Sequence, residues 1–485
     1  MYAMKKSMML VSLLAVLCGC RESVPMLPEE GAAVRDYVPL YAVLAHRGST
    51  YWAPEETESA WRWAREMGAD YLESDLQCTK DGIILANHDE NLTRTTDIAT
   101  RFGDNIPATR LALYRQLGFS EEDARAQLQR DQAHFRPYYA ASYYYAELLT
   151  LDAGGWFNAA NPDRARKAFA NHPDKPGCGL LPYTTGEYVS ALQDQIAYAE
   201  GKRLRRDADG RRILPWSLKK AFEGMTLAQI AAQAKEDGKY MECIQYDFGQ
   251  AYEADPQDSG HRPGIYIEFK EPEVNPIDME ERVYAILDQA GWNILTRPAT
   301  ESAFYKDGKV NVGRTQGKVI LQTFSTASLK RAHKVFQGKI PMCFLLWPPC
   351  PEDIPGGDLG TRKGYIALLK WAQENGAHII GPAIAGEPNN YAELNEAWQA
   401  ELVREAGMLN HPYSFDTLEQ MDREVSRGDG FFTNRSEMTL QYLLDHGLRG
   451  RSGLKDPFHP DRTYDNAEAP GNVPDAKETL DRLGY

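Results

Sequence analysis

The 485-residue sequence lacks the features of several protein classes. Lys and Arg together number 54 against 69 Asp and Glu, and the net charge of −15 leaves no general basic surface for nucleic acid. No stretch approaches the ~20 apolar residues that a membrane-spanning helix needs. Internal repeats and low-complexity tracts are not visible either. With 43% hydrophobic and 25% charged residues, the composition is that of a globular protein with a large core and no nucleic-acid partner.

Cysteine is scarce as well, with seven residues in the whole chain. No C-x-x-C pair is present, which excludes a zinc ribbon and a thioredoxin-like motif. Two of the seven, Cys18 and Cys20, close an apolar segment near the N-terminus. The other five allow at most two disulfides, and the sequence leaves their pairing open.

The N-terminal segment has the order of a signal peptide. Lys5 and Lys6 precede an apolar run over residues 8–17, which is too short to cross a bilayer. The run ends in Leu17-Cys18-Gly19-Cys20, which resembles the lipobox of bacterial lipoproteins. That resemblance implies cleavage after residue 19 and a lipid on Cys20. We therefore expect a signal peptide over residues 1–19, a polar tether over 20–37 and an extracytoplasmic protein anchored to a bacterial membrane; an ordinary secretory signal is the alternative.

From residue 38 onward, short apolar runs alternate with segments of helical spacing. Such alternation over some 400 residues favours an α/β fold with a parallel sheet or barrel. The pattern predicts strands over residues 41–45, 71–78, 83–87, 265–269, 319–324, 342–346, 378–380 and 431–433. It predicts helices over residues 55–67, 121–132, 278–289, 363–373 and 392–405. Residues from about 100 to 260 break the rhythm and are expected to be one or two insertions, and residues 451–485 a tail over the surface.

The residues that carry chemistry are concentrated between positions 46 and 96. Glu73 and Asp75 lie two apart on a predicted strand, so both carboxylates point to one face. Asp81-Gly82 is a strong signal for a two-residue hairpin turn, and that register sets His88 opposite Asp75. Two carboxylates with no nearby cysteine suit Mg²⁺ or Ca²⁺. Taken alone, the same hairpin could also be exposed, with its charges facing water.

The preceding strand favours the functional interpretation. His46 and Arg47 follow directly on the apolar run 41–45, at the carboxyl end of that strand, where parallel α/β folds bind their ligands. Arg47 has a planar guanidinium suited to phosphate oxygens, and His46 can accept or donate a proton near neutral pH. Carboxylates, a phosphate-binding group and two histidines within 43 residues indicate an active site.

These pieces together resemble the glycerophosphodiester phosphodiesterase family. The resemblance covers residues of about 40–97, 146–157 and 264–445, and it leaves the insertions uncovered. Its N-terminal motifs are His46-Arg47-Gly48, Ala53-Pro54-Glu55-Glu56-Thr57, the segment 68–75, Thr79-Lys80-Asp81-Gly82, His88-Asp89 and Arg94-Thr95-Thr96. Its later motifs are the segment 147–157, Ile267-Glu268-Phe269-Lys270, Gln322-Thr323-Phe324-Ser325, His411-Pro412-Tyr413 and Thr433-Asn434-Arg435.

The resemblance implies a TIM-type (β/α)8 barrel over residues 38–450 that hydrolyses glycerophosphodiesters to sn-glycerol 3-phosphate and an alcohol, using one divalent cation, Mg²⁺ or Ca²⁺. By motif, His46 and His88 match the catalytic acid/base pair. Arg47 and Lys270 match the phosphate contacts. Glu73, Asp75 and Glu268 match the metal ligands. Which histidine is the acid and which the base stays open at this point.

Two alternatives remain beside this function. The same machinery could act on another lipid-linked or glycan-linked phosphodiester, in the manner of a phospholipase D, with the insertions selecting the substrate. A lipoprotein that binds a phosphorylated ligand without turnover is the second alternative.

The sequence departs from the family at two positions. Glu56 stands where the family usually has Asn, and Asn434 where Asp is common. We expect neither to touch the catalytic or metal residues. A cluster formed by Tyr138, Tyr139 and Tyr143–Tyr145 is expected to pack in the core or a loop rather than to form a cage for a cationic head group.

Overall fold

The computed structural model describes residues 23–171, 186–235, 240–270 and 274–485, and its centre is a closed barrel of eight parallel strands. Around the barrel, each strand pairs with the next one in chain order. The strands are β1 (Ala42–Ala45), β2 (Tyr71–Cys78), β9 (Gly264–Phe269), β12 (Val319–Thr323), β13 (Met342–Leu346), β14 (Ile379–Pro382), β15 (Leu409–Asn410) and β16 (Gly430–Thr433).

Hydrogen bonds between the first and last members of this sheet close the barrel. The amide of Asp429 donates to the carbonyl of Asn410 at 2.7 Å, and Phe415 donates to Phe432 at 2.7 Å. On its other side, β16 pairs with β1 from Ala42 to Ala45. The expected TIM-type (β/α)8 fold is therefore confirmed. β15 is the one barrel strand that was not predicted. It has only two residues, Leu409 and Asn410, and therefore no apolar run of the length typical of a strand.

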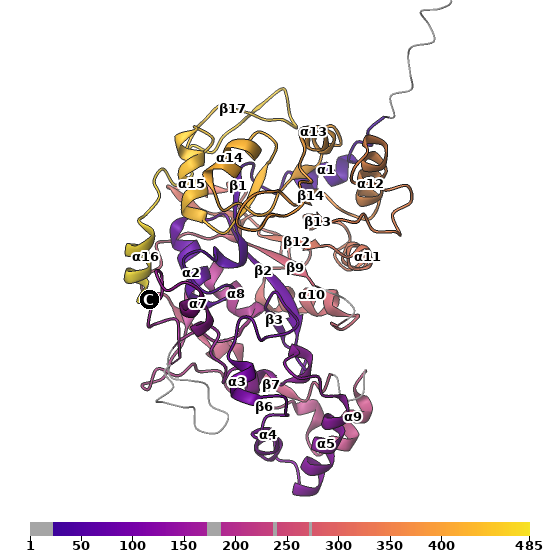
Figure 1. Cartoon of the computed structure of the whole chain (residues 1–485), viewed down its shortest axis with the longest axis vertical. Coiled ribbons are helices and arrows are strands. Elements are labelled where there is room, and N and C mark those ends of the chain that lie inside the picture. Colours follow the sequence, from indigo (N-terminus) through magenta and orange to yellow (C-terminus); the bar gives the residue numbers. More distant parts are fainter. Residues whose placement is uncertain (1–22, 172–185, 236–239, 271–273) are drawn as a thin grey trace, which may run out of the picture.

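Eight helices surround the barrel, one after each strand (Figure 1). Between β2 and its helix α8, the chain forms several additional elements. Each carries an apolar face that packs on the strands, such as Leu368, Leu369 and Ala372 in α12. The helices are α2 (Glu58–Met67), α8 (Leu192–Ala199), α10 (Met279–Ala290), α11 (Thr326–Val335), α12 (Arg362–Glu374), α13 (Ala397–Glu405), α14 (Leu418–Glu424) and α15 (Ser436–Asp445).

The interior of the barrel is filled by alternate residues of the strands. Tyr71 of β2, Tyr266 of β9 and Phe432 of β16 are buried there, with ring centroids 6.0 Å apart for the two tyrosines and 4.9 Å apart for Tyr266 and Phe432. Their chain neighbours, such as Ile265 and Ile267, pack outward in the separate core beneath the helices. This period of two decides which later residue of each strand reaches the mouth of the barrel.

Residues 79–263 separate β2 from β9 and build a large insertion, which extends below the barrel in Figure 1. Before α8, it contains β3 (Ile84–Ala86), α3 (Ile98–Phe102), α4 (Arg110–Gln116), α5 (Glu121–His134), α6 (Tyr145–Leu148), α7 (Gly155–Ala160) and β4 (Ser190–Ala191). After α8 come β5 (Lys202–Leu204), β6 (Trp216–Leu218), α9 (Leu227–Gln233), β7 (Ile244–Tyr246) and β8 (Tyr252–Ala254). Tyr143, Tyr144 and Tyr145 are buried within this insertion, as expected for packing residues.

The two ends of the described chain pack on the barrel. Residues Glu29–Arg35 form α1, and the amide of Leu27 donates to the carbonyl of Ala406 at 2.8 Å, so the tether expected over residues 20–37 does not extend through this segment. At the other end, α16 (Ala476–Leu483) packs against α2 with Leu480 fully buried. Residues 1–22, with the expected signal peptide and Cys20, lie outside the described residues.

The sequence left open whether disulfides form. Among the described residues, Cys78, Cys243, Cys343 and Cys350 are free thiols. Within the ranges given above, no helix is both long enough and apolar enough to cross a membrane.

A buried ion pair at the amino-terminal end of β2 is expected to contribute strongly to stability. Arg449 donates to both carboxylate oxygens of Asp70, at 2.8 and 3.0 Å, and both side chains are inaccessible to solvent. Replacing Arg449 by leucine leaves a buried charge without its partner and is expected to cost about 3–5 kcal/mol of unfolding free energy. Urea denaturation followed by circular dichroism measures this. The matched change at the exposed Arg362–Glu405 pair should hardly move the midpoint, and equal effects of the two substitutions would contradict the prediction.

Candidate active site

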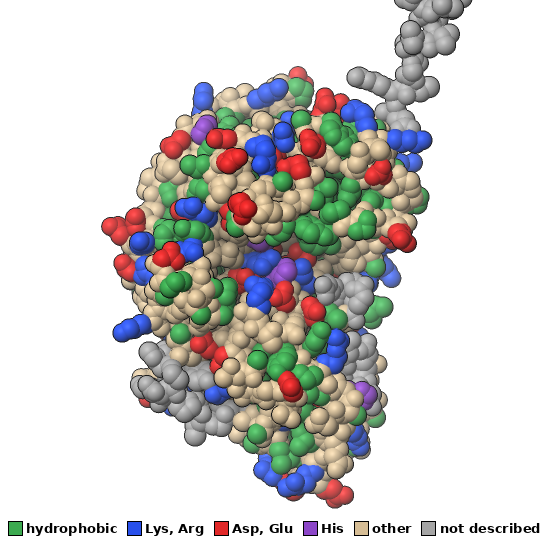
Figure 2. Space-filling view, in the orientation of Figure 1, with side chains coloured by type: hydrophobic (Ala, Val, Ile, Leu, Met, Phe, Trp, Pro, Cys, Tyr) green, Lys and Arg blue, Asp and Glu red, His purple; other side chains and the backbone are tan. Residues whose placement is uncertain are grey.

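A pocket of about 670 Å³ opens at the carboxyl ends of the barrel strands. Figure 2 shows histidine, basic and acidic side chains gathered in a hollow near the middle of this face. All seven residues that the sequence singled out line the pocket: His46, Arg47, Glu73, Asp75, His88, Glu268 and Lys270. The structure therefore brings together residues from four separate parts of the chain.

The alternation inside the barrel explains how these side chains reach the pocket. Tyr71 fills the barrel centre, so Glu73 and Asp75 on the same face of β2 point inward and progressively nearer the mouth. Tyr266 sets the same parity on β9, which brings Glu268 and then Lys270 to the pocket. The same inward face of each strand therefore carries apolar side chains in the centre of the barrel and polar side chains at its mouth.

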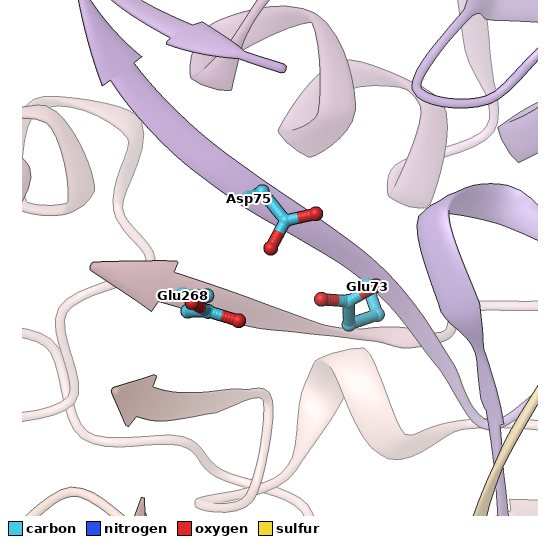
Figure 3. Close-up of side chains that lie close together, drawn as sticks. All are labelled: Glu73, Asp75 and Glu268. Carbon is cyan, nitrogen blue, oxygen red and sulfur yellow. The ribbon is translucent and has the colours of Figure 1, made fainter. Parts of the chain in front are cut away.

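Glu73, Asp75 and Glu268 form an acidic cluster with the geometry of a metal site. One oxygen of each carboxylate lies within 4.8 Å of the others, and all three side chains are buried. Figure 3 shows the carboxylates of the two strands converging on a shared space. Oδ2 of Asp75 is buried and, among the described residues, accepts no hydrogen bond, although Nε of Arg47 lies 3.1 Å away. Three convergent carboxylates with an unsatisfied oxygen fit a hard cation such as Mg²⁺ or Ca²⁺.

The electrostatics of the triad are those of crowded carboxylates. Burial, together with the nearby charge of Asp75, raises the pKa of Glu73 well above its usual value. Burial also raises the pKa of Glu268 to about 8, although Lys270 opposes the rise. The pKa of Asp75 is lowered, because the positive charges of His88, Arg47 and Lys270 outweigh its burial. A divalent cation would relieve the repulsion that these groups share.

Arg47 lines the pocket as the sequence predicted, and neighbouring carboxylates hold it in place. Its backbone, at φ 50°, lies in the left-handed region, and its amide donates to Oε2 of Glu73 at 2.7 Å. Its guanidinium lies within ion-pair distance of Asp75 and of Glu55, at 3.1 and 3.5 Å. Glu55 in turn accepts two hydrogen bonds from Arg94, at 2.6 and 2.9 Å. This charge network fixes a cationic group beside the triad.

His46 is hydrogen-bonded to a neutral partner. Its Nδ1 lies 2.7 Å from Oδ1 of Asn434, which follows β16. An amide oxygen can only accept, so Nδ1 carries the hydrogen and Nε2 keeps its lone pair. Burial, reinforced by the charge of Arg47, lowers the pKa of His46 to about 3. The imidazole is therefore neutral near pH 7 and able to accept a proton.

His88 is paired with charged groups instead. Its Nδ1 lies 2.6 Å from Oδ1 of Asp89, and its Nε2 lies 3.3 Å from Nζ of Lys270. Asp89 is itself held by Nε of Arg94 at 2.5 Å. Through Arg94 and Glu55, the two sides of the pocket are tied together by one network. An imidazolium formed at His88 would be ion-paired with Asp89.

The hairpin that led the sequence analysis to His88 has a different register from the predicted one. Leu76 pairs with Ala86 and Cys78 with Ile84, and the amide of Asn87 donates to the carbonyl of Asp75 at 2.9 Å. Asp75 therefore faces Asn87, and the prediction that it faces His88 is wrong. The turn has three residues rather than two, with Gly82 at φ 80° in the last of them, which shifts the pairing by one residue. His88 still reaches the pocket because it lies beyond the end of β3.

Residues 46–199 match the model of the glycerophosphoryl diester phosphodiesterase family. A glycerophosphodiester phosphodiesterase of Bacillus subtilis is 23% identical over 396 residues, which cover 81% of this chain and 84% of that protein. The chain is similar to this family over residues 46–199 and to the Bacillus subtilis protein over most of its length. It is a phosphoric diester hydrolase.

Two other similarities cover different extents. A glycerophosphodiester phosphodiesterase of Arabidopsis thaliana is 41% identical over 96 residues, which cover 19% of this chain and a quarter (25%) of that relative. The solved structure of an Oleispira antarctica phosphodiesterase in complex with sn-glycerol 3-phosphate is 13% identical, with a TM-score of 0.43. That comparison covers 83% of this chain and 97% of the other.

Both departures from the family pattern lie closer to the site than we expected. Asn434 contacts His46 directly, as described above, and Oε1 of Glu56 accepts a hydrogen bond of 2.6 Å from the amide of Asp75. The expectation that neither position touches the catalytic or metal residues is therefore wrong. The reason is topological, because the loops after β1 and β16 meet at the mouth of a closed barrel.

Gln322 of β12 is a site residue to which the sequence analysis gave no role. Its Nε2 donates to Oε1 of Glu73 at 2.8 Å, and the side chain is buried in the pocket lining. Ile320, two residues earlier, fills the barrel interior, so the period of two on this strand was the available signal. Gln322 orients one of the carboxylates of the phosphodiesterase.

Metal affinity in this phosphodiesterase is expected to increase as the pH rises toward 8. Glu268 has a pKa of about 8 and must lose its proton before it can bind a cation, so protons compete with the metal below that pH. Calorimetric titration with Mg²⁺ or Ca²⁺ at pH 6, 7 and 8 should show affinity rising by up to about tenfold per pH unit. In the Glu268→Gln variant this dependence should weaken, and the part that comes from Glu73 should remain. Equal affinity at all three pH values in the parent protein would contradict the prediction.

Proposed function

We propose that this protein hydrolyses glycerophosphodiesters to sn-glycerol 3-phosphate and an alcohol by acid/base catalysis between two histidines. The observation that carries the proposal is the asymmetry of these histidines within one pocket. His46 faces a neutral amide, whereas His88 faces a carboxylate. A carboxylate triad and two cations, Arg47 and Lys270, line the same pocket. The Bacillus subtilis relative, which matches 81% of this chain, supports this choice of substrate by its name.

In this mechanism His46 is the general base. Its Nε2 accepts a proton from the attacking oxygen while that oxygen forms a bond to phosphorus. Attack by water gives sn-glycerol 3-phosphate directly, whereas attack by a neighbouring hydroxyl of the substrate gives a cyclic phosphate that water must open in a second step. A base kept neutral by burial stays competent throughout the neutral pH range. The hydrogen bond to Asn434 holds the ring while it becomes charged.

His88 is the general acid in this mechanism. As the bond from phosphorus to the leaving oxygen breaks, Nε2 of His88 donates a proton to that oxygen, and the alcohol departs neutral. Asp89 stabilises the imidazolium before the transfer. Lys270, 3.3 Å from the same nitrogen, is placed to receive a phosphate oxygen beside the acid.

The charged groups around the phosphate would stabilise the developing charge. Glu73, Asp75 and Glu268 are proposed to hold one Mg²⁺ or Ca²⁺, which when bound neutralises phosphate charge and acts as a Lewis acid. The guanidinium of Arg47 and the ammonium of Lys270 supply donors on the same side of the pocket. Asp75 and Glu268 also keep both cations in place, through contacts of 3.1 and 3.2 Å.

A phosphate-binding protein without catalysis is the less favoured second function. Binding of a phosphate needs only cations and a metal site. It does not need one histidine that accepts a proton and another that donates one. The same catalytic residues could also hydrolyse another lipid-linked or glycan-linked phosphodiester. The assay of several substrates distinguishes this alternative from the leading proposal.

The experiment uses the chain from residue 21 onward, stripped of metal with a chelator. Glycerophosphocholine, glycerophosphoethanolamine, glycerophosphoglycerol and glycerophosphoinositol are each offered with Mg²⁺, with Ca²⁺ and without metal. Metal-dependent release of sn-glycerol 3-phosphate supports the proposal and ranks the head groups. Metal binding without turnover of any of the four would reject it in favour of a different phosphodiester or of binding alone.

We also propose that the protein is held outside the cytoplasm by a lipid on Cys20. The support is the order of charged, apolar and Leu17-Cys18-Gly19-Cys20 segments in the sequence. Mass spectrometry of the N-terminal peptide, compared with that of a Cys20→Ser variant, tests this. A mature protein that begins elsewhere, or an unmodified Cys20, would contradict it.

A further inference from the structure

A chain of hydrogen bonds continues behind His46, away from the pocket. Oδ1 of Asn434 faces Nδ1 of His46 at 2.7 Å, and Nδ2 of Asn434 donates to Oδ1 of Asp416 at 2.9 Å. Asn434 follows β16, and Asp416 lies one residue after Phe415, which pairs with Thr433 of that strand. Asp416 is not among the residues that line the pocket, and hydrogen bonds link it to His46 through Asn434.

The donors and acceptors along this chain leave a single consistent arrangement. A carboxylate accepts hydrogen bonds and cannot donate them, so the NH₂ group of Asn434 must face Asp416. Its carbonyl oxygen is thereby turned toward His46, where it can only accept. Nδ1 of His46 must therefore carry the hydrogen, and Nε2 presents its lone pair to the pocket.

Asp416 is itself held firmly enough to impose this order. Its Oδ2 accepts a hydrogen bond from Nδ2 of Asn389 at 3.1 Å, and its amide donates to Oε1 of Gln420 at 2.7 Å. Asn389 belongs to the loop after β14 and Gln420 to α14. Asn434 and Asn389 thus hold the carboxylate, and Gln420 holds the backbone of the same residue.

We infer that Asp416 is a positioning residue that sets the tautomer of His46 through Asn434; the inference rests on the proposed role of His46 as general base. The amide at position 434 makes this residue necessary. An Asp at that position, common in the family, offers two equivalent oxygens and needs no orientation. The amide of Asn434 has one oxygen and one NH₂ group, and a flip would turn a donor toward His46 and place the hydrogen on Nε2, where it blocks proton acceptance.

The test combines kinetics with ¹⁵N NMR of histidine-labelled protein, in which the His46 signals are assigned by their loss in His46→Gln. The parent is expected to show the hydrogen on Nδ1. Asp416→Ala should give a mixture of tautomers and a kcat lower by about 10- to 100-fold, with KM changed by less than about threefold. Asp416→Asn, whose oxygen can still accept from Asn434, should restore most of the rate. The matched control Asp422→Ala, which loses a carboxylate bonded to Tyr442 nearby, should change neither reading.

A second background keeps the test informative if Asp416→Ala folds poorly. In Asn434→Asp, the group at position 434 needs no orientation, so adding Asp416→Ala should lower kcat by less than about threefold and leave the hydrogen on Nδ1. A loss as large as in the Asn434 background would overturn the inference. So would a parent with the hydrogen on Nε2, or an unchanged tautomer in Asp416→Ala. The NMR reading needs no turnover, so failure of the proposed reaction and failure of this inference are separate results.

Discussion

Replacement of His46 by alanine is expected to lower kcat by about two to four orders of magnitude while leaving the binding of sn-glycerol 3-phosphate nearly intact. The base is removed, but the phosphate-binding cations and the carboxylate triad remain, because the side chain of His46 is hydrogen-bonded to Asn434. Turnover is measured with the best glycerophosphodiester of the substrate series, and product binding by calorimetry.

The control for this variant is His446→Ala. His446 lies outside the pocket and stacks on Tyr442, with ring centroids 3.9 Å apart, so its loss should leave turnover unchanged. Parent-like turnover in His46→Ala would remove His46 from the mechanism. A loss of product binding as large as the loss of rate would instead assign it a binding role.

Replacement of Glu73 by glutamine is expected to weaken metal binding by about 100-fold or more and to lower turnover in parallel at limiting metal. The change removes one charge from a triad of three carboxylates without changing its size. Both carboxylate oxygens of Glu73 now accept hydrogen bonds, from the amide of Arg47 at 2.7 Å and from Nε2 of Gln322 at 2.8 Å. Glutamine replaces one of these acceptor oxygens by an NH₂ donor. Calorimetric titration of the chelator-stripped protein measures the affinity, and added metal should recover part of the activity.

Glu437→Gln is the matched control, since this carboxylate pairs with Arg435 outside the pocket. It should bind metal as the parent does. If Glu73→Gln binds Mg²⁺ and Ca²⁺ as tightly as the parent protein, Glu73 is not a ligand and the triad has another purpose. Turnover that persists in the presence of excess chelator would argue against any metal in the reaction.

The barrel could be predicted because its signals are local. Continuous apolar runs such as Met342–Leu346 become strands buried on both faces, and the predicted bounds of that strand are those of β13. The register of the Asp81-Gly82 turn could not be predicted in this way. A two-residue and a three-residue turn both accommodate a glycine at positive φ, and packing around the hairpin selects between them.

The contacts of Asn434, Glu56 and Gln322 depended on the order of the strands in the sheet. Each residue lies on or after a different strand, and the pairing of β1 with β2 and β16 brings Glu56 and Asn434 to the site. Sequence spacing carries no information on such contacts, since Asn434 lies 388 residues from His46. The sequence could identify the chemical groups of the site but not their hydrogen-bond partners.

The sequence by itself determined the alternation of strands and helices, the inward face shared by Glu73 and Asp75, and the pairing of Glu268 with Lys270, because a period of two is a property of the extended backbone. Only the tertiary structure decided which histidine faces an amide and which a carboxylate. That difference arises from side chains far apart in the chain, and it is burial at the mouth of the barrel that lowers the pKa of His46.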